Sequence, residues 1–217
     1  MKKLSLILVL LLAGTLVFAQ TLPLSGGAGL RYTVADSTLS GTLKIFDTAT
    51  STQTKSALFG LGLFLDGNYV SVDLGLIFPL VDSTVVSTIG TNVTTNDYTS
   101  TSKITFLDLG LYLKYPVQLG SVVAFPVLGI EYDILLSAKT EDGDDISGID
   151  NNLWVKLGAG LDFSLNKHLY LRPLVLFGIG IHTPDDAEQI SNTEILANDV
   201  QLTKLRTDIG LKVGYRF

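Results

Sequence analysis

Residues 205–217, at the end of the chain, read L-R-T-D-I-G-L-K-V-G-Y-R-F. Every odd-numbered position in this stretch except Thr207 is apolar or aromatic, and every even-numbered position is charged or glycine. Since successive side chains of a β-strand point to opposite faces, the alternation predicts a strand with one apolar face and one face of charges and glycines. The apolar face requires contact with lipid or with a protein core.

The same alternation recurs along the rest of the chain and predicts seven further strands. A tight hairpin turn is expected at Asp66-Gly67-Asn68, because these residues accept the left-handed conformations of such turns. Pro126 and Pro173 interrupt two of the strands, and since proline cannot donate to a ladder we expect a bulge or a register irregularity there. The seven predicted strands span about residues 24–34, 55–65, 69–78, 103–115, 121–136, 152–163 and 169–182.

The predicted connections alternate in length. Those after the second, fourth and sixth strands are short, whereas those after the first, third, fifth and seventh cover about residues 35–54, 79–102, 137–151 and 183–203. The segment 83–102 is rich in Thr, Ser and Asn, which predicts a mobile low-complexity loop.

The first residues have the pattern of a secretory signal. Lys2 and Lys3 precede an apolar run from Leu4 to Val17, and cleavage is expected after Ala19. We therefore expect residues 1–19 to be a signal peptide and residues 20–217 to form one domain. The chain has no cysteine and a net charge of −6, which becomes more negative when the two lysines are removed with the signal. Without disulfides, an exported chain depends on its own burial and hydrogen bonding.

Eight alternating strands suit a membrane barrel or a soluble lipocalin-like barrel, and the polar face separates the two. A solvent-facing exterior would be rich in Lys, Glu and Thr. Here that face consists of glycine and isolated charges of both signs, which suits the crowded interior of a narrow barrel. The sequence therefore predicts an all-β fold, an eight-stranded antiparallel up-and-down transmembrane β-barrel whose apolar face meets lipid.

The aromatic C-terminus, with Tyr215 two positions before Phe217, resembles the C-terminal signature of bacterial outer-membrane β-barrels. The chain is similar to the small eight-stranded group of OmpX, OmpW and the barrel domain of OmpA. The resemblance implies a bacterial outer-membrane location, with short turns and both termini in the periplasm and long loops at the cell surface. It also implies that the barrel-assembly machinery reads Tyr215 and Phe217 as an insertion signal.

The parity of the strands assigns charged residues of both signs to the lumen. Because buried charges survive only when they are paired, we predict a salt-bridged and largely closed lumen. A gated polar conduit lined by the same residues is the alternative. The predicted lumen charges are Arg31, Asp73, Asp108, Lys114, Glu131, Asp133, Lys156, Asp162, Arg172, Arg206, Asp208, Lys212 and Arg216.

Candidates for chemistry are few, and we predict neither catalytic residues nor a cofactor. His168 falls in a short turn and is expected to be solvated. His182 lies near acidic residues at the predicted outer rim, but no nucleophile motif accompanies it. The acidic run with Asp142, Asp144 and Asp145 offers oxygen atoms that calcium accepts, yet it lacks the helix-loop-helix calcium signature, so a solvated acidic loop is the prediction.

The predicted role is structural or surface-interacting, in adhesion or envelope integrity, with the acidic loops available to an extracellular ligand. Most of the 21 acidic residues lie in the long connections, which disfavours nucleic acid as a partner. We expect a monomer. The alternative is an OmpW-like channel for small hydrophobic molecules, which would need an apolar pocket near the outer rim. Its candidate lining residues are Phe125, Val127, Leu135, Leu174 and Leu176.

Overall fold

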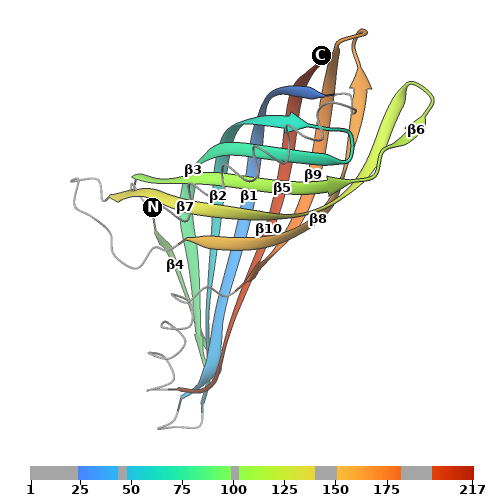
Figure 1. Ribbon diagram of the computed structural model, residues 1–217. Helices are drawn as coiled ribbons and strands as arrows, with labels where there is room; N and C mark the ends of the chain where they lie inside the picture. Colours follow the sequence, from blue (N-terminus) through green and yellow to red (C-terminus); the bar gives the residue numbers. More distant parts are fainter. Residues whose placement is uncertain (1–23, 44–47, 99–102, 140–150, 182–196) are drawn as a thin grey trace, which may run out of the picture.

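The computed structural model describes residues 24–43, 48–98, 103–139, 151–181 and 197–217. In these ranges no helix is long and apolar enough to cross a membrane. Strands dominate them (Figure 1). Their bounds are β1 Ser25–Leu43, β2 Thr48–Asp66, β3 Val70–Ile89, β4 Asn92–Tyr98, β5 Lys103–Lys114, β6 Val117–Leu119, β7 Val122–Lys139, β8 Asn152–Ser164, β9 Leu169–Ile181 and β10 Ala197–Arg216.

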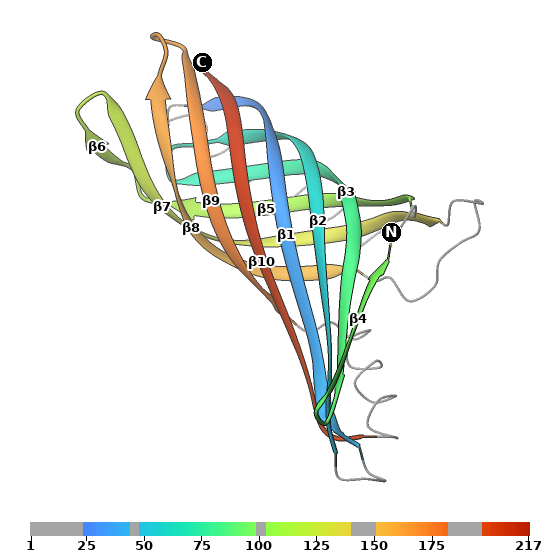
Figure 2. The same ribbon diagram turned by 180° about the vertical axis from the view of Figure 1, so that it is seen from behind.

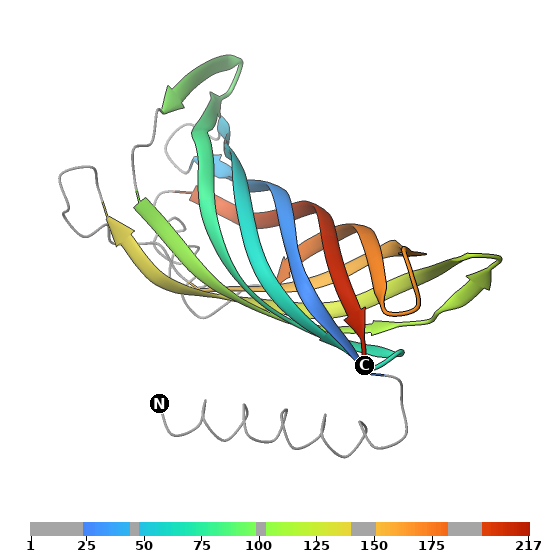
Figure 3. The ribbon, with the colours of Figure 1, turned by 90° about the horizontal axis from the view of Figure 1, so that it is seen from above.

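Eight of these strands close into a ring of antiparallel neighbours (Figure 3). The order around the ring is β1, β2, β3, β5, β7, β8, β9 and β10, and β10 pairs with β1 to complete it. β4 pairs only with β3, and β6 pairs only with the start of β7. The predicted eight-stranded antiparallel barrel is confirmed.

The two faces of β10 differ as the alternation predicts. Ile209 and Leu211 are 56% and 46% exposed on the outside of the ring, while Arg206 and Asp208 are 3% and 1% exposed on the inside. A membrane barrel has this arrangement because hydrocarbon, not a protein core, covers its apolar side. Most of the buried residues in the described ranges therefore lie in the lumen.

Four ring strands continue far beyond the level at which their neighbours stop. β9 pairs with β10 only as far as Ile179–Leu205, and β5 pairs with β3 only as far as Phe106–Ile77. Beyond those levels β10, β1, β2, β3 and β4 form a sheet of their own, which runs away from the ring in Figures 1 and 2. We call it the protruding sheet, and it comprises residues 35–43, 48–57, 79–89, 92–98 and 197–204.

The protruding sheet corrects two sequence-based expectations. The predicted loop 35–54 is mostly strand, because β1 and β2 stay in register from Ala35–Ser56 to Leu43–Thr48. Most of the segment 83–102, expected to be a mobile loop, is the β3–β4 hairpin, closed at Gly90 with a φ of 58°. Thr has a high β propensity, so a Thr-rich segment that resembles a loop in composition can form a strand.

No register shift occurs at Pro126 or Pro173 in the described ladders, so the expected register irregularities are wrong. Pro126 pairs with Ala159 in an unbroken β7–β8 ladder, and its carbonyl accepts from Tyr115, one residue beyond the end of β5. The N–H that Pro126 lacks would face β5, where the β5–β7 ladder has already ended at Lys114–Val127. At Pro173 the β8–β9 pairing has a gap between Leu174 and Leu171, yet the register is the same on both sides.

The connections β2–β3, β5–β7 and β8–β9 lie at one end of the ring, which we call the turn rim. The predicted hairpin at residues 66–70 is confirmed, with Asn68 at a φ of 64° and Gly67 N donating to Val70 O at 2.8 Å. The expected link at 116–120 is instead a small β6–β7 hairpin. Phe217 N donates to Leu24 O at 3.0 Å, so the C-terminus lies at this rim as well (Figure 1).

Candidate functional site

The lumen is the only part of the described chain in which polar and charged side chains are collectively buried, so it is the candidate site. Glycines in the barrel wall make room for its large side chains. A Cβ atom at Gly129 would lie 2.3 Å from Tyr112, and one at Gly214 would lie 2.2 Å from Tyr170. Both tyrosines thus lie flat against wall positions that only glycine can occupy.

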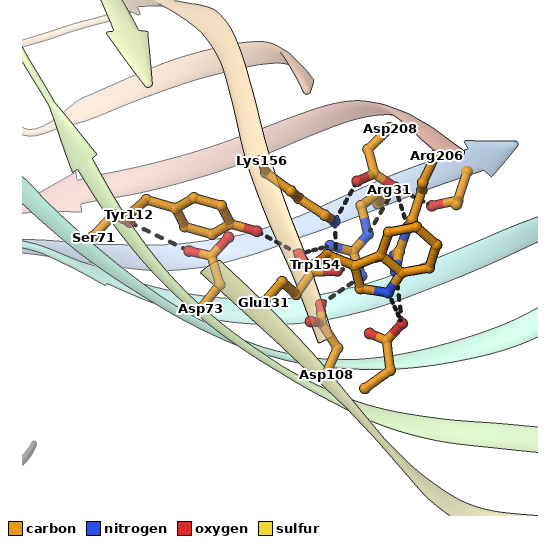
Figure 4. Close-up of polar contacts among 12 residues, drawn as sticks. Arg31, Ser71, Asp73, Asp108, Tyr112, Glu131, Trp154, Lys156, Arg206 and Asp208 are labelled. Atoms are coloured by element: carbon orange, nitrogen blue, oxygen red, sulfur yellow. Dashed lines mark hydrogen bonds and ion pairs between the residues drawn. The ribbon is translucent and has the colours of Figure 1, made fainter. Parts of the chain in front are cut away.

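Glu131 of β7 is the centre of the largest group of charges (Figure 4). Its Oε1 accepts from Lys156 Nζ at 2.5 Å and lies 3.1 Å from Arg206 Nη2. Its Oε2 accepts from Arg31 Nη1 at 2.8 Å and also from the Tyr112 hydroxyl. The Glu131 side chain is fully buried, so these contacts replace all of its hydration.

Three aspartates surround this centre. Asp208 accepts from Lys156 Nζ at 2.5 Å and from Arg206 Nε at 3.0 Å. Asp133 accepts from Arg206 Nη1 at 2.7 Å, and Asp108 pairs with Arg31. The charged residues form what we call the central cluster: Arg31, Asp108, Glu131, Asp133, Lys156, Arg206 and Asp208.

A second group of charges lies nearer the turn rim. Arg172 of β9 donates to Asp162 at 2.6 Å and 2.8 Å and to Asp66 at 2.5 Å. Lys114 of β5 donates to the same Asp66 oxygen at 2.6 Å. We call Asp66, Lys114, Asp162 and Arg172 the turn-rim cluster. Its charges balance, two cations against two carboxylates.

Aromatic rings enclose the cation at the middle of the turn-rim cluster. The Arg172 guanidinium lies 4.9 Å from the Phe125 ring centroid, 5.1 Å from that of Tyr170 and 5.4 Å from that of Phe64. Cations over aromatic faces are attracted by the ring quadrupole, more strongly when water is excluded. Side chains therefore occupy most of this end of the lumen, and they leave a cavity of only about 20 Å3 beside Lys114 and Arg172.

An apolar layer separates the two clusters. It consists of Tyr112, Phe125, Val127 and Leu176, with Leu174 packed against it. Tyr112 contacts the central cluster through its hydroxyl, and the Phe125 ring faces Lys114 and Arg172 of the turn-rim cluster. Along the barrel axis the lumen therefore presents ion pairs, an apolar layer and ion pairs again.

The remaining lumen pair, Lys212–Asp73, borders a small cavity. The cavity measures about 40 Å3 and also touches Arg31, Asp108 and Asp208 of the central cluster. A buried water needs about 10–15 Å3 of such volume, so the cavity has room for about three waters. It is too small for a hydrated ion to pass through.

The structure brings together every predicted lumen charge except Arg216 in ion pairs. Arg216 instead donates to Ser164 Oγ at 3.0 Å and lies over the Tyr170 ring at the turn rim. It occupies the last lumen-facing position of β10, where the ring ends and no carboxylate lies opposite: its partner in β1 is Ser25.

Sequence reasoning missed Asp66. The sequence analysis places it in the hairpin turn 66–68 and not among the lumen charges, whereas its side chain is 2% exposed and pairs with two cations. Its parity, shared with the lumen-facing Phe64, was the available signal. The polar partners Thr33, Tyr112 and Trp154 were also not singled out, although each lies at a lumen position and contacts a carboxylate.

His168 is exposed at the turn rim, as expected, but it is not simply solvated. Its ring stacks on Tyr215 with centroids 5.3 Å apart, and Tyr215 in turn meets Phe217 edge-on at 5.5 Å. The three rings form an aromatic group at the rim of the lipid-facing surface, where membrane barrels carry their aromatic girdles.

The other sequence candidates lie outside the described residues. His182 and its acidic neighbours fall in 182–196, and Asp142, Asp144 and Asp145 fall in 140–150. The lumen itself contains no Ser-His or Cys-His pair among the described residues, because its two described clusters consist only of carboxylates, lysines and arginines.

Several solved structures are similar to this chain at low sequence identity. Neisserial surface protein A is 12% identical, with 89% of this chain and 99% of that chain covered and a TM-score of 0.41. The outer membrane protein OprG from Pseudomonas aeruginosa is 16% identical, with coverages of 88% and 96% and a TM-score of 0.40. The outer membrane protease OmpT from Escherichia coli is 6% identical, with coverages of 90% and 97% and a TM-score of 0.48.

A search of curated protein sequences found no match. The family model described as "Outer membrane protein beta-barrel domain", in contrast, matches residues 5–217, nearly the whole chain. The closed ring, the apolar exterior and the charged lumen agree with that match. The chain therefore belongs to the outer membrane protein β-barrel domain family.

Proposed function

We propose that this protein is a closed outer-membrane barrel with a structural and surface-interacting role. In the proposed orientation, the turn rim and both termini face the periplasm and the protruding sheet stands outside the cell. Residues 1–19 serve as the signal peptide, and Tyr215 and Phe217 form the insertion signal for the barrel-assembly machinery. The protein acts as a monomer in outer-membrane lipid.

The main support for a closed barrel is the succession of two charged clusters and an apolar layer along the lumen. A permeating ion would have to separate the pairs around Glu131, cross the apolar layer at Phe125 and then separate the pairs of Arg172. Breaking a buried ion pair costs about 3–5 kcal/mol, so each charged layer alone makes passage rare.

The protruding sheet supports a role outside the membrane. Its strands are rich in Thr and Ser on both faces, as in T-A-T-S-T-Q-T-K-S-A of residues 48–57. Neither face of this segment suits hydrocarbon, because one face carries only Thr and Ser and the other carries Ser51, Gln53 and Lys55. A rigid polar sheet held away from the bilayer presents backbone and hydroxyl groups to a partner at the cell surface.

Single-channel recording in planar bilayers tests the closed lumen. We expect the wild-type protein to show no steady conductance. The double substitution Arg206→Gln with Asp208→Asn should introduce openings, because it removes contacts from Lys156, Glu131 and Asp133 at once. Asp36→Asn in the protruding sheet, outside the lumen, is the matched control. Steady conductance in the wild type would refute a closed barrel.

Two further experiments test the orientation and the surface role. An epitope inserted after Gly90 should bind antibody on intact cells, and the same epitope after Lys167 should bind only after the outer membrane is permeabilised. Replacing residues 85–96 with Asn-Gly removes most of the β3–β4 hairpin and leaves a two-residue turn. Cells carrying that variant should adhere less to a host-cell layer, while unchanged adhesion would count against the sheet as the contact surface.

The channel for small hydrophobic molecules gains no support from four of its five nominated residues; the fifth, Leu135, is half-buried in β7 beyond the central cluster. Phe125, Val127 and Leu176 are buried in the layer between the two clusters, with Leu174 packed against them. Ion pairs lie on both sides of that layer, so these side chains fill the lumen and do not line a pocket at the far rim. We therefore propose the closed barrel alone.

A further inference from the structure

Two buried aspartates of the central cluster lie directly opposite each other. Asp108 of β5 pairs with Asp133 of β7 in the ladder, and the two residues are 3% and 4% exposed. Directly opposed side chains on one face of an antiparallel pair have Cβ atoms about 4.5–5.5 Å apart, and like charges at such positions are destabilising. Two ionised carboxylates this close together and this deeply buried would repel each other strongly.

One oxygen of each carboxyl group has no hydrogen-bond partner in the described part of the chain. These atoms are Asp108 Oδ1 and Asp133 Oδ1. The other oxygen of each group is well bound: Asp108 Oδ2 pairs with Arg31, and Asp133 Oδ2 accepts from Arg206 and Trp154. An unsatisfied buried acceptor is costly. Asp66 Oδ1 and Arg206 Nη2 also lack a hydrogen-bond partner among the described residues, so the two orphan oxygens count only together with the opposed register and the charge of the cluster.

The charge of the central cluster points the same way. Its cations are Arg31, Lys156 and Arg206, and its carboxylates are Asp108, Glu131, Asp133 and Asp208, which leaves one negative charge in excess. An uncompensated buried charge is among the most destabilising features that a structure can have. A single proton would remove the excess and would supply the missing donor.

We propose that Asp108 and Asp133 together hold one proton, as a buried proton-binding pair that makes the central cluster neutral. Two carboxyl groups that cannot both ionise share a proton in this way in other proteins. The charged and titratable groups that surround the pair come from β1 (Arg31), β5 (Tyr112), β7 (Glu131), β8 (Lys156) and β10 (Arg206 and Asp208). All three cations among them already have carboxylate partners.

A metal ion is the competing occupant. Oxygen atoms of Asp108, Glu131 and Asp133 lie within 4.8 Å of one another, a spacing that could hold one. Both oxygens of Glu131 are already occupied, however, by Lys156 and Arg206 on one side and by Arg31 and Tyr112 on the other. A divalent ion would also turn an excess of one negative charge into an excess of one positive charge.

Infrared spectroscopy of the whole chain in lipid vesicles tests the proton directly. The wild-type protein at neutral pH should show the C=O stretching band of one buried carboxylic acid. Carbon-13 labelling of the aspartate carboxyl groups should shift that band. Asp108→Asn and Asp133→Asn should each abolish it, because the remaining carboxylate then has an amide neighbour and a cation partner. Asp162→Asn, in the balanced turn-rim cluster, is the control and should leave the band intact.

The outcomes separate the alternatives. Absence of the band in the wild type, or its survival in either single variant, would overturn the proposal. Loss of the wild-type band on adding calcium, together with a higher melting temperature, would instead assign the site to a metal ion. The labelling experiment needs no substitution, so it decides the matter even if a variant fails to fold. Conductance is a separate readout, so a closed lumen could hold while the proton pair fails.

Discussion

The ring and the protruding sheet share strands β1, β2, β3 and β10, yet the two regions lie in different surroundings. Within β10, residues 205–217 alternate between apolar side chains and charges or glycines, and the strand has lipid on one side and a packed lumen on the other. Residues 197–204 of the same strand read A-N-D-V-Q-L-T-K and pair with β1 alone. The change in pattern marks the level at which the chain leaves hydrocarbon.

The comparison shows where the stability of this protein is concentrated. In the ring, a buried charge has several partners of opposite sign. Removing one charge therefore leaves its partners buried with less compensating charge. In the protruding sheet, contacts such as Gln53 Nε2 to Asp36 at 2.6 Å compete with solvent. Equivalent substitutions in the two regions should therefore have very different effects.

Removing one charge from each region should give the largest contrast. Glu131→Gln leaves Arg31, Lys156 and Arg206 short of a carboxylate, and we expect it to lower the free energy of unfolding by about 3–5 kcal/mol. Asp36→Asn keeps an acceptor for Gln53 and should change it by less than about 0.5 kcal/mol. Urea unfolding in lipid vesicles measures both. Equal effects would contradict the contrast.

Placing an arginine on the outer face of each region should give the next largest difference. Leu211→Arg puts a charge into lipid and should cost about 2–4 kcal/mol if the position lies near the bilayer midplane. Ser51→Arg in β2 of the protruding sheet should be nearly neutral, because that position meets water. The fraction of folded protein, followed by heat-modifiable mobility in gels, reports both. A costly Ser51→Arg would place the sheet within the membrane.

Adding a side chain at a glycine of each region should give the smallest difference in stability between the two regions. Gly129→Ala forces a methyl group against the Tyr112 ring and should cost about 1–3 kcal/mol of global stability. Gly90→Ala meets a positive φ in the β3–β4 turn and should cost about 1–2 kcal/mol locally. Hydrogen exchange should rise around the lumen in the first variant and only in β3 and β4 in the second.

Much of the ring was predictable because its signal is local. Alternation in β10, β8 and β5 assigned each side chain to lipid or lumen, and hydrogen bonding in a bilayer leaves a closed barrel as the only way to satisfy the strands. The protruding sheet was not predicted, since Thr- and Ser-rich alternation with two polar faces has no hydrophobic period to detect. The protruding sheet depends on the pairing of β1 with β10 and β2, and of β3 with β2 and β4, and periodicity along the chain does not reveal these pairings.

The candidate site divides in the same way. The alternation of the strands places Glu131, Lys156 and Arg206 inside the barrel. Asp66 has the same parity as the lumen-facing Phe64, but its place in the hairpin turn 66–68 hid that signal. Parity also could not show that Asp108 lies opposite Asp133, since that depends on the register between β5 and β7.

The amino-acid sequence by itself determined the strand class, the two faces of each ring strand and the charges that the lumen must hold. Only the tertiary structure decided which charges meet, where the apolar layer lies and how far the strands extend beyond the ring. The physical reason is that the face of a side chain follows from its neighbours along the chain. Its partners follow from the stagger between strands far apart in the chain, such as those of Thr33 and Asp208, which are 175 residues apart.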